Sequence, residues 1–276
     1  MIETEEMDGI RLIASDLDGT LLDENKQLPP DFFSVIRRLD NVKFIAASGR
    51  QYFNLLKFFA PIQDRIGLIA ENGALLWDGG RIIHTHPLSG QDALFMLRQA
   101  KKAPNAYCIL CGEKSAYIEN GPEHMMRGAI RSYDRCRVVE RMEDQIEKDR
   151  ILKIAVHSIE NQAEFDAYPA LNHLVGNFKV ILSGSASVDV MAKGVHKGEG
   201  LKIFRERLGL GKKQCMAFGD YLNDFELLAE AEESYAMENA HPRLKEAAKY
   251  IAPSNQSDGV MQIIRRRFRD SINQSI

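Results

Sequence analysis

The sequence has no long hydrophobic run, little cysteine and almost no net charge. None of its segments approaches the roughly 18 uninterrupted apolar residues that a membrane-spanning helix needs. Four cysteines in 276 residues are too few for a disulfide framework. A formal net charge of −3 gives no electrostatic reason to expect nucleic acid or an anionic membrane as a partner. The first residues, MIETEEMDGI, lack the basic and then apolar pattern of a secretory signal, so we expect a cytoplasmic protein.

Two groups of possible metal ligands are incomplete. Cys108 and Cys111 form a C-x2-C pair, but no second pair follows it. The stretch YCILCGEKSAYI instead predicts two strands joined by a glycine-containing turn. His84 and His86 precede a proline, which is more typical of a linker than of a ligand pair.

The beginning and the end of the chain alternate between strand and helix patterns. The apolar runs RLIAS, VKFIAAS and IGLIA are separated by two helical stretches, of which the first opens at Pro29-Pro30. A hairpin with its turn at Asp78-Gly79-Gly80 follows. The alternation returns from Lys193 onward, with QCMAFGD as the next strand. Strands separated by helices predict an α/β fold with a parallel sheet.

The middle of the chain has a different pattern. Here the expected strands come in adjacent pairs, such as FKVILSG and SVDVMA, which predicts an α+β unit with an antiparallel sheet. The simplest organisation is a discontinuous core, residues 1–86 and 192–276, with an inserted domain at 87–191. Little regular structure is expected between Arg131 and Arg150.

Two pairs of carboxylates follow predicted strands. Asp16 and Asp18 end the first strand, and Asp220 and Asp224 follow the strand in QCMAFGD. Ligands of open parallel sheets bind beyond the carboxyl ends of the strands, so both pairs are expected in one crevice. Several carboxylates this close cannot all stay ionised unaided, and Mg2+ with oxygen ligands is the natural remedy.

Two further segments suggest a phosphate site beside this metal. Ser48 and Gly49 follow a strand, where a hydroxyl and backbone N–H groups can hold a phosphate. Lys197 begins a helix and adds a positive charge where the helix N-terminus also favours an anion.

At this point the sequence resembles the haloacid dehalogenase-like phosphatases. Four stretches match the four motifs of that family in order: DLDGT at 16–20, SGR at 48–50, Lys197-Gly198, and GDYLND at 219–224. Accessory stretches are similar to those of the Cof-type sugar-phosphatase branch: ENG at 71–73, ENAHPRLK at 238–245 and SNQSDGV at 254–260. The resemblance implies a Rossmann-like core with a parallel sheet. It also implies that the insert is the α+β cap that this branch carries between its second and third motifs.

The resemblance also implies the reaction. Asp16 would be the nucleophile that forms an aspartyl-phosphate, and Asp18 the general acid and then the base. Thr20 would hydrogen-bond within the loop and aim Asp18. Ser48, Gly49 and Lys197 would bind the phosphoryl oxygens.

Other residues would hold the metal or support the cleft. Mg2+ would be held by Asp16, the backbone carbonyl of Asp18 and Asp220. Asn223 or Asp224 would support its water shell, although Asp224 could also cap the following helix. Arg50 is expected to brace its loop, and Asn72 to serve either the cleft or only a turn.

The leading hypothesis is a Mg2+-dependent phosphatase of small phosphomonoesters, such as sugar or metabolite phosphates. A phosphomutase would use the same Asp16 and return the phosphoryl group to its substrate. A signalling receiver is disfavoured by the length, the insert and Asp18, and a non-catalytic sugar-phosphate sensor by the presence of both Asp16 and Asp18. The insert contains no motif that indicates a particular sugar, and its irregular stretch fits either a permissive cleft or a mobile lid.

Overall fold

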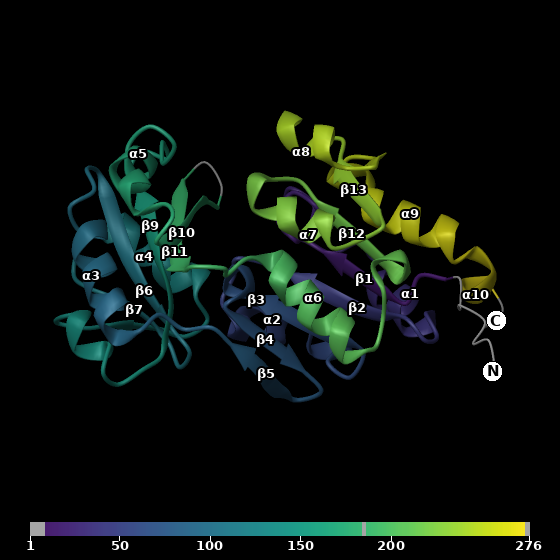
Figure 1. The fold of residues 1–276 in the computed structure, drawn as a ribbon, viewed down its shortest axis with the longest axis horizontal. Helices are drawn as coiled ribbons and strands as arrows, with labels where there is room; N and C mark the ends of the chain where they lie inside the picture. Colours follow the sequence, from purple (N-terminus) through teal and green to yellow (C-terminus); the bar gives the residue numbers. More distant parts are fainter. Residues whose placement is uncertain (1–8, 184–185, 274–276) are drawn as a thin grey trace.

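Two β-sheets form two lobes that lie side by side in the computed structural model, which describes residues 9–183 and 186–273 (Figure 1). One sheet has eight strands in the order β14-β13-β12-β1-β2-β3-β4-β5. The other has six strands in the order β10-β11-β9-β6-β7-β8. The first sheet uses segments from both ends of the chain, and the second uses only the middle. The mixed α/β fold expected from the sequence is therefore confirmed.

Six strands of the larger sheet run parallel, and a hairpin extends one edge. Neighbouring strands from β14 to β3 are parallel, while β3 with β4 and β4 with β5 are antiparallel. The hairpin turns at Gly79 and Gly80, as predicted. The strand bounds are β1 Leu12–Ser15, β2 Lys43–Ala47, β3 Ile66–Ala70, β4 Leu75–Asp78, β5 Arg81–Thr85, β12 Cys215–Gly219, β13 Glu233–Met237 and β14 Tyr250–Ala252.

The central strands of this sheet are buried along their whole length. Every residue of β1, β3 and β12 is buried, as expected for parallel strands covered by helices on both faces. Helix α1 begins at Phe32, later than expected, because Pro29 and Pro30 lie in a turn in which the Phe32 N–H donates to the Pro29 carbonyl. The helices of this lobe are α1 Phe32–Arg38, α2 Tyr52–Phe58, α6 Lys197–Arg207, α7 Phe225–Ala229, α8 Pro242–Ala247, α9 Gly259–Arg267 and α10 Arg269–Asn273.

The smaller sheet is antiparallel except for its last pair, β7 and β8. Helices α3 and α5 pack on one face with Ile154 and Val156, while α4 packs on the other face beside Ala155. Strand β8 lies in the stretch expected to be irregular. The bounds are β6 Ala106–Gly112, β7 Ala116–Ile118, β8 Cys136–Val138, β9 Ile151–Ser158, β10 Phe178–Leu182, β11 Ser187–Ala192, α3 Gly90–Ala100, α4 Glu123–Ser132 and α5 Ala167–Leu171.

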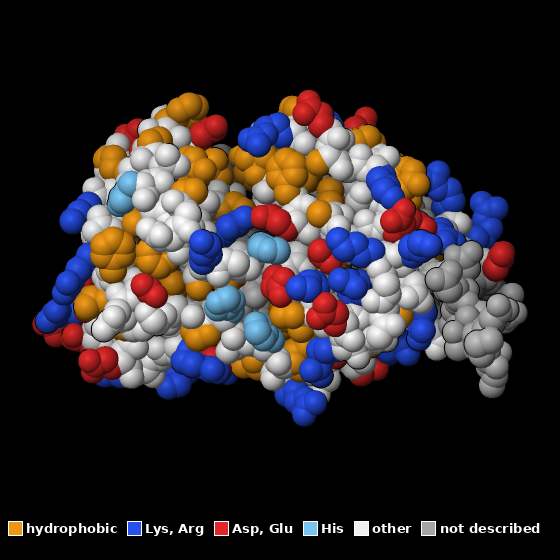
Figure 2. Space-filling model, viewed as in Figure 1, with side chains coloured by type: hydrophobic (Ala, Val, Ile, Leu, Met, Phe, Trp, Pro, Cys, Tyr) orange, Lys and Arg blue, Asp and Glu red, His pale blue; other side chains and the backbone are white. Residues whose placement is uncertain are grey.

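The two cysteines of the C-x2-C pair point to opposite faces of β6. Cys108 packs in the cluster with α3, and Cys111 packs in the cluster with α4. They cannot share a metal ion, which agrees with the interpretation of this stretch as two strands. Within the described ranges, 9–183 and 186–273, none of the helices is long and apolar enough to span a membrane. Figure 2 shows Lys and Arg interspersed with Asp and Glu on the face in view.

Candidate active site

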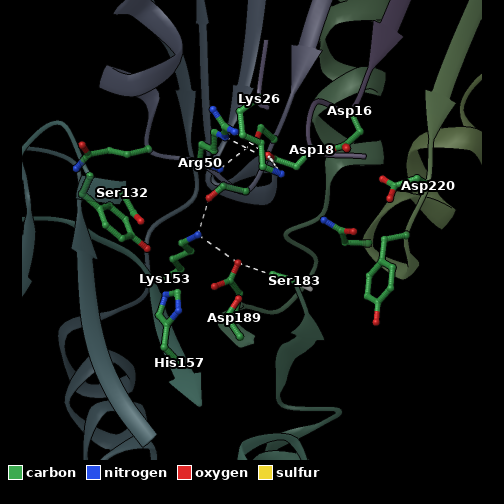
Figure 3. Close-up of a pocket in the computed structure, with 17 residues that line it drawn as sticks. Asp16, Asp18, Lys26, Arg50, Ser132, Lys153, His157, Ser183, Asp189 and Asp220 are labelled. Atoms are coloured by element: carbon green, nitrogen blue, oxygen red, sulfur yellow. Dashed lines mark hydrogen bonds and ion pairs between the residues drawn. The ribbon is translucent and has the colours of Figure 1, made fainter. Parts of the chain in front are cut away.

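A cavity of about 400 Å³ lies between the two lobes and contains charged residues from both. Figure 3 shows Asp16, Asp18 and Asp220 at one end of this cavity and Lys153, His157 and Asp189 at the other. The first group follows strands of the larger sheet, and the second lies on strands β9 and β11 of the smaller sheet. The remaining lining residues are Lys26, Ser48, Gly49, Arg50, Gln51, Ser132, Tyr133, Ser183, Ser187, Tyr221 and Asn223.

Lys197 lies between two carboxylates beside the cavity. Its Nζ is 2.6 Å from Oδ1 of Asp16 and 2.7 Å from Oδ1 of Asp224. The lysine is 1% exposed, and Asp224 is fully buried. Burial alone would lower the pKa of the Lys197 ammonium, but the charges and hydrogen bonds of Asp16 and Asp224 raise it. The three side chains therefore form a charged cluster that holds the Asp16 carboxylate in place.

Asp224 is fixed by its neighbours and does not cap the helix after it. Its Oδ2 accepts hydrogen bonds from the backbone N–H groups of Asp220, at 3.1 Å, and Tyr221, at 3.2 Å. The structure records no side-chain cap from Asp224 to α7. Both carboxylate oxygens are thus already engaged, one by Lys197 and the other by the GDYLND turn.

Asp220 completes a cluster of three carboxylates. Ligand oxygens of Asp16, Asp220 and Asp224 all lie within 4.8 Å of one another. Burial, followed by repulsion from Asp16 and Asp224, raises the pKa of Asp220 to about 8. Burial raises the pKa of Asp16 to about 6, although Lys197 opposes this shift. Without a further cation the cluster carries more negative charge than the site can neutralise.

Thr20 and Gly19 connect the DLDGT loop to Asp220. The Thr20 hydroxyl donates to Oδ1 of Asp220 at 3.0 Å, rather than to a group of its own loop as expected. Gly19 has a φ of +87°, and a Cβ there would come within 2.3 Å of Asp220 Oδ2. Only glycine allows this approach without displacing the Asp220 carboxylate.

Asp18 is held by two cations. Arg50 donates from Nε to Oδ2 at 2.7 Å and from its terminal nitrogen to Oδ1 at 2.6 Å, and Lys26 lies 2.9 Å from Oδ1. Burial alone would raise the pKa of the Asp18 carboxyl, but Arg50 and then Lys26 lower it below its ordinary value. Arg50 therefore contacts Asp18 directly, and Lys26 is a site residue that no motif indicated.

The SGR segment lines the cavity between these groups. The Ser48 hydroxyl accepts a hydrogen bond from the Arg50 N–H at 3.2 Å, and the Ser48 N–H donates to the Ile69 carbonyl at 2.8 Å. The Gly49 carbonyl accepts a hydrogen bond from Lys153 Nζ at 2.6 Å. Among the described residues the Gly49 N–H has no protein acceptor, so it is the backbone donor this segment can offer to a ligand.

Asn72 joins the two lobes. Its side-chain oxygen accepts from Asn223 at 3.2 Å, and its side-chain nitrogen donates to Oδ2 of Asp189 at 2.6 Å. The ENG turn has positive φ values at Glu71, Asn72 and Gly73, of 49°, 55° and 109°. Two consecutive non-glycine residues in this region are uncommon and mark a local strain that tends to occur at functional sites. Asn72 is therefore part of the cleft as well as part of a turn.

Lys153 and Asp189 form the other half of this connection, and sequence reasoning missed both. Lys153 is 3% exposed and lies 3.1 Å from Oε2 of Glu71 and 3.2 Å from Oδ2 of Asp189. Burial alone would lower the pKa of the Lys153 ammonium, but these carboxylates raise it. The available signal was one charged residue inside each of two apolar strands, ILKIAVHS and SVDVMA.

The accessory stretches near the C-terminus support the DLDGT loop. Asn239 of ENAHPRLK donates to the Gly19 carbonyl at 2.8 Å, and Asn255 of SNQSDGV donates to the Leu22 carbonyl at 2.7 Å. These two amides therefore satisfy backbone carbonyls in and just after the DLDGT loop.

The family model of the haloacid dehalogenase-like hydrolases matches residues 13–264. This match covers most of the chain, and the chain belongs to that family. The lobe with the eight-stranded sheet is the core of a haloacid dehalogenase-like hydrolase, and the lobe with the six-stranded sheet is its cap.

Relatives and solved structures agree with this assignment. The chain is 32% identical to the 5-amino-6-(5-phospho-D-ribitylamino)uracil phosphatase YbjI of Escherichia coli over 92% of this chain and 95% of that protein. It is 25% identical to the Bacillus subtilis phosphatase YcsE, which has the same substrate in its name, over 96% of this chain and 98% of that protein. The crystal structure of SMU.1108c from Streptococcus mutans superposes with a TM-score of 0.85 at 27% identity, covering 95% of this chain and 100% of that one. The chain is a phosphatase of this family.

Proposed function

We propose that the protein is a Mg2+-dependent phosphomonoester hydrolase that works through a phosphorylated Asp16. The observation that carries this proposal is the position of Asp16. Its carboxylate is buried at the end of a cavity, held by Lys197 at 2.6 Å and followed two residues later by Asp18. A fixed nucleophile with an acid or base beside it is the arrangement that covalent phosphoryl transfer requires.

The donor set fits a hard divalent cation. All three groups of the cluster are carboxylates, which are ligands that Mg2+ prefers. Burial, and after it repulsion between the carboxylates, raises the pKa values of Asp16 and Asp220, and a bound cation would favour their ionised forms. Asp16, Asp220 and the backbone carbonyl of Asp18 would hold Mg2+. Asn223 and Asp224 would support the water shell of the ion and not bind it directly. Asp224 is already bonded to Lys197 and to two backbone N–H groups. The ion would neutralise charge on the transferred phosphoryl group.

The protein's own groups account for both halves of the reaction. Asp16 attacks phosphorus while the bond to the leaving oxygen breaks, and Asp18 donates a proton to that oxygen. Asp18 then takes a proton from water, which attacks phosphorus and frees Asp16. Lys197 and the Gly49 N–H would bind the phosphoryl oxygens, with the Ser48 hydroxyl beside them. An entering phosphoryl group would compete with Asp18 for Arg50 and Lys26, which allows Asp18 to become protonated.

The cavity supports the proposed substrate class. A volume of about 400 Å³ is within the range of small-molecule sites, and the lining is rich in hydroxyl and charged groups. A small polar phosphomonoester, such as a sugar or metabolite phosphate, suits this space. The compound in the names of two relatives, 5-amino-6-(5-phospho-D-ribitylamino)uracil, is the first candidate to test. We also propose the domain bounds 1–86 with 192–276 for the core and 87–191 for the cap.

The test is phosphate release from a panel of phosphomonoesters, with Mg2+ or with a chelator. Wild type should release phosphate only with Mg2+, and Asp16→Asn should release none because an amide does not attack phosphorus. Asp144→Asn, which changes an exposed cap aspartate, is the matched control and should behave as wild type. Phosphate release by Asp16→Asn at the wild-type rate would contradict the proposal. Transfer of the phosphoryl group to a second position of the substrate would indicate a phosphomutase.

A further inference from the structure

Asp189 presents a half-occupied carboxylate to the cap end of the cavity. Three donors reach the same oxygen, Oδ2: Asn72 at 2.6 Å, Ser183 at 2.6 Å and Lys153 at 3.2 Å. Asp189 is only 2% exposed, and it lines the cavity. Its other oxygen, Oδ1, accepts no hydrogen bond from any residue in 9–183 or 186–273 and is not one of the enclosed atoms that lack a partner. Because Asp189 lines the cavity and Oδ1 has no donor among the described residues, Oδ1 is the oxygen available there to accept a hydrogen bond from a ligand.

The position of Asp189 is fixed relative to the phosphate-binding segment. Lys153, which contacts Asp189, also donates to the Gly49 carbonyl at 2.6 Å. Asn72, which contacts Asp189 from the other side, is bonded to Asn223 of the GDYLND turn. Figure 3 shows Asp189 beside Lys153 and Ser183, across the cavity from Asp16 and Asp220. A phosphomonoester bound at Asp16 would extend its leaving group toward this carboxylate.

Among the lining residues that the structure describes, the cap end of the cavity also has no cation free of a carboxylate partner. The one ammonium of Lys153 lies within ion-pair distance of two carboxylates, Glu71 and Asp189. Burial lowers the pKa of the His157 imidazole and so favours its neutral form. The other cations of the lining, Lys26 and Arg50, are paired with Asp18 at the opposite end. A second anionic group on the leaving group would meet Asp189 without a compensating charge.

We propose that Asp189 determines substrate specificity by accepting a hydrogen bond from a hydroxyl or amine of the leaving group. The carboxylate favours phosphomonoesters of polyols and sugars and disfavours leaving groups that carry a second negative charge. Asn72, Ser183 and Lys153 are the positioning residues that keep Oδ1 aimed into the cavity. This inference rests on the proposed phosphatase function and adds the recognition of the leaving group to it.

Asp189→Asn is the most informative variant. The three donors on Oδ2 would hold the amide oxygen of the new side chain, so its NH2 group would replace Oδ1. The substitution keeps the shape and turns the open acceptor into a donor. Asp149→Asn is the matched control, because Asp149 is a buried cap aspartate that bonds Lys114 and Tyr117 and does not line the cavity.

The experiment measures kcat/KM with Mg2+ for ribitol 5-phosphate, phenyl phosphate and glycerate 3-phosphate. Wild type should prefer ribitol 5-phosphate to the other two. In Asp189→Asn the ratio of ribitol 5-phosphate to phenyl phosphate should fall about 10- to 100-fold, the effect of losing a hydrogen bond to a charged group. The ratio of glycerate 3-phosphate to phenyl phosphate should rise, and Asp149→Asn should keep both wild-type ratios.

The outcomes separate the two proposals. The inference is overturned if wild type hydrolyses phenyl phosphate but Asp189→Asn keeps the wild-type kcat/KM ratios. The phosphatase function would remain supported in that case. Absence of phosphate release from all three compounds would overturn both. If Asp189→Asn does not fold, deoxy analogues of ribitol 5-phosphate replace it as the test on wild type. A loss of less than about threefold at every deoxygenated position would then overturn the inference.

Discussion

Nζ of Lys197 lies 2.6 Å from Oδ1 of Asp16, although 181 positions separate the two residues in the sequence. The same ammonium lies 2.7 Å from Asp224, so one cation holds together the segments that follow the parallel strands β1 and β12. The contact is buried, so removing the lysine would leave the Asp16 and Asp224 carboxylates without their cation. Under the proposed mechanism, catalysis and stability should therefore depend on the same side chain.

Replacing Lys197 by methionine should destabilise the protein and abolish activity. Methionine leaves Asp16 and Asp224 buried without their cation, and removing one partner of a buried ion pair costs about 3–5 kcal/mol. Urea unfolding in the presence of a chelator measures this loss. Lys202→Met, on the exposed side of the same helix, should change the free energy of unfolding by less than about 0.5 kcal/mol. Equal stability of the two variants would show that Lys197 does not compensate the carboxylates.

The metal-free protein should become less stable as the pH rises. The ordinary pKa of aspartate is about 4, whereas the pKa of Asp220 is raised to about 8 by burial and by Asp16 and Asp224. Between these values the folded state holds a proton that the unfolded state has released, so stability falls with increasing pH. Thermal unfolding with a chelator should therefore give a lower Tm at pH 8 than at pH 6.

Mg2+ should reverse this trend, because it competes with that proton for the same carboxylates. The increase in Tm on adding Mg2+ should be larger at pH 8 than at pH 6. Asp220→Asn removes the titrating group and should flatten the pH dependence of the metal-free protein. A Tm that does not respond to Mg2+ at either pH would argue against the carboxylate cluster as a metal site.

Asp18→Asn should trap the phosphorylated enzyme. An aryl phosphate has a good leaving group and needs little acid assistance, so Asp16 should still be phosphorylated. The second step needs Asp18 to activate water, and losing a general base slows a reaction about 10²- to 10⁴-fold. Rapid mixing with p-nitrophenyl phosphate should show a burst of phenolate, and mass spectrometry should find one phosphoryl group on Asp16. Asp23→Asn, a nearby control, should show neither the phenolate burst nor a trapped phosphoryl group. If Asp18→Asn gives no phenolate burst, the two-step mechanism is contradicted.

Gln51 should control how firmly the cap is held on the core. Its side chain accepts from the Arg135 N–H and donates to the Arg135 carbonyl, both at 3.0 Å. Gln51→Ala removes both hydrogen bonds, each worth about 0.5–1.5 kcal/mol, although the Arg135 carbonyl keeps the Ala116 N–H and the Ser115 hydroxyl as donors. Hydrogen exchange of the amides at 133–136 should accelerate. Gln63→Ala, which loses an amide-to-backbone hydrogen bond within the core, should leave that exchange unchanged. Unchanged exchange in Gln51→Ala would mean that other contacts hold the cap.

The parallel sheet and the core of the site could be predicted because the relevant information is local. An apolar run such as RLIAS or QCMAFGD indicates a buried strand, and residues that follow such strands meet at one edge of a parallel sheet. These patterns therefore predict that Asp16, Asp18, Asp220 and Asp224 converge in one crevice, and a predicted helix start adds Lys197. The four family motifs carry the same information in compact form.

The contacts between the lobes required the tertiary structure. Lys153 and Asp189 lie in strands whose other residues are mostly apolar, and nothing nearby in sequence indicates which partners they reach. Their contacts with Glu71, Asn72 and the Gly49 carbonyl depend on how the cap packs against the core. Similarly, the sequence predicts Asp224 near the proposed metal, but only the packing of α6 against the GDYLND turn brings Lys197 to its Oδ1. Hydrophobic periodicity acts over a few residues, whereas these hydrogen bonds join segments that are distant in the chain and meet only in the folded protein.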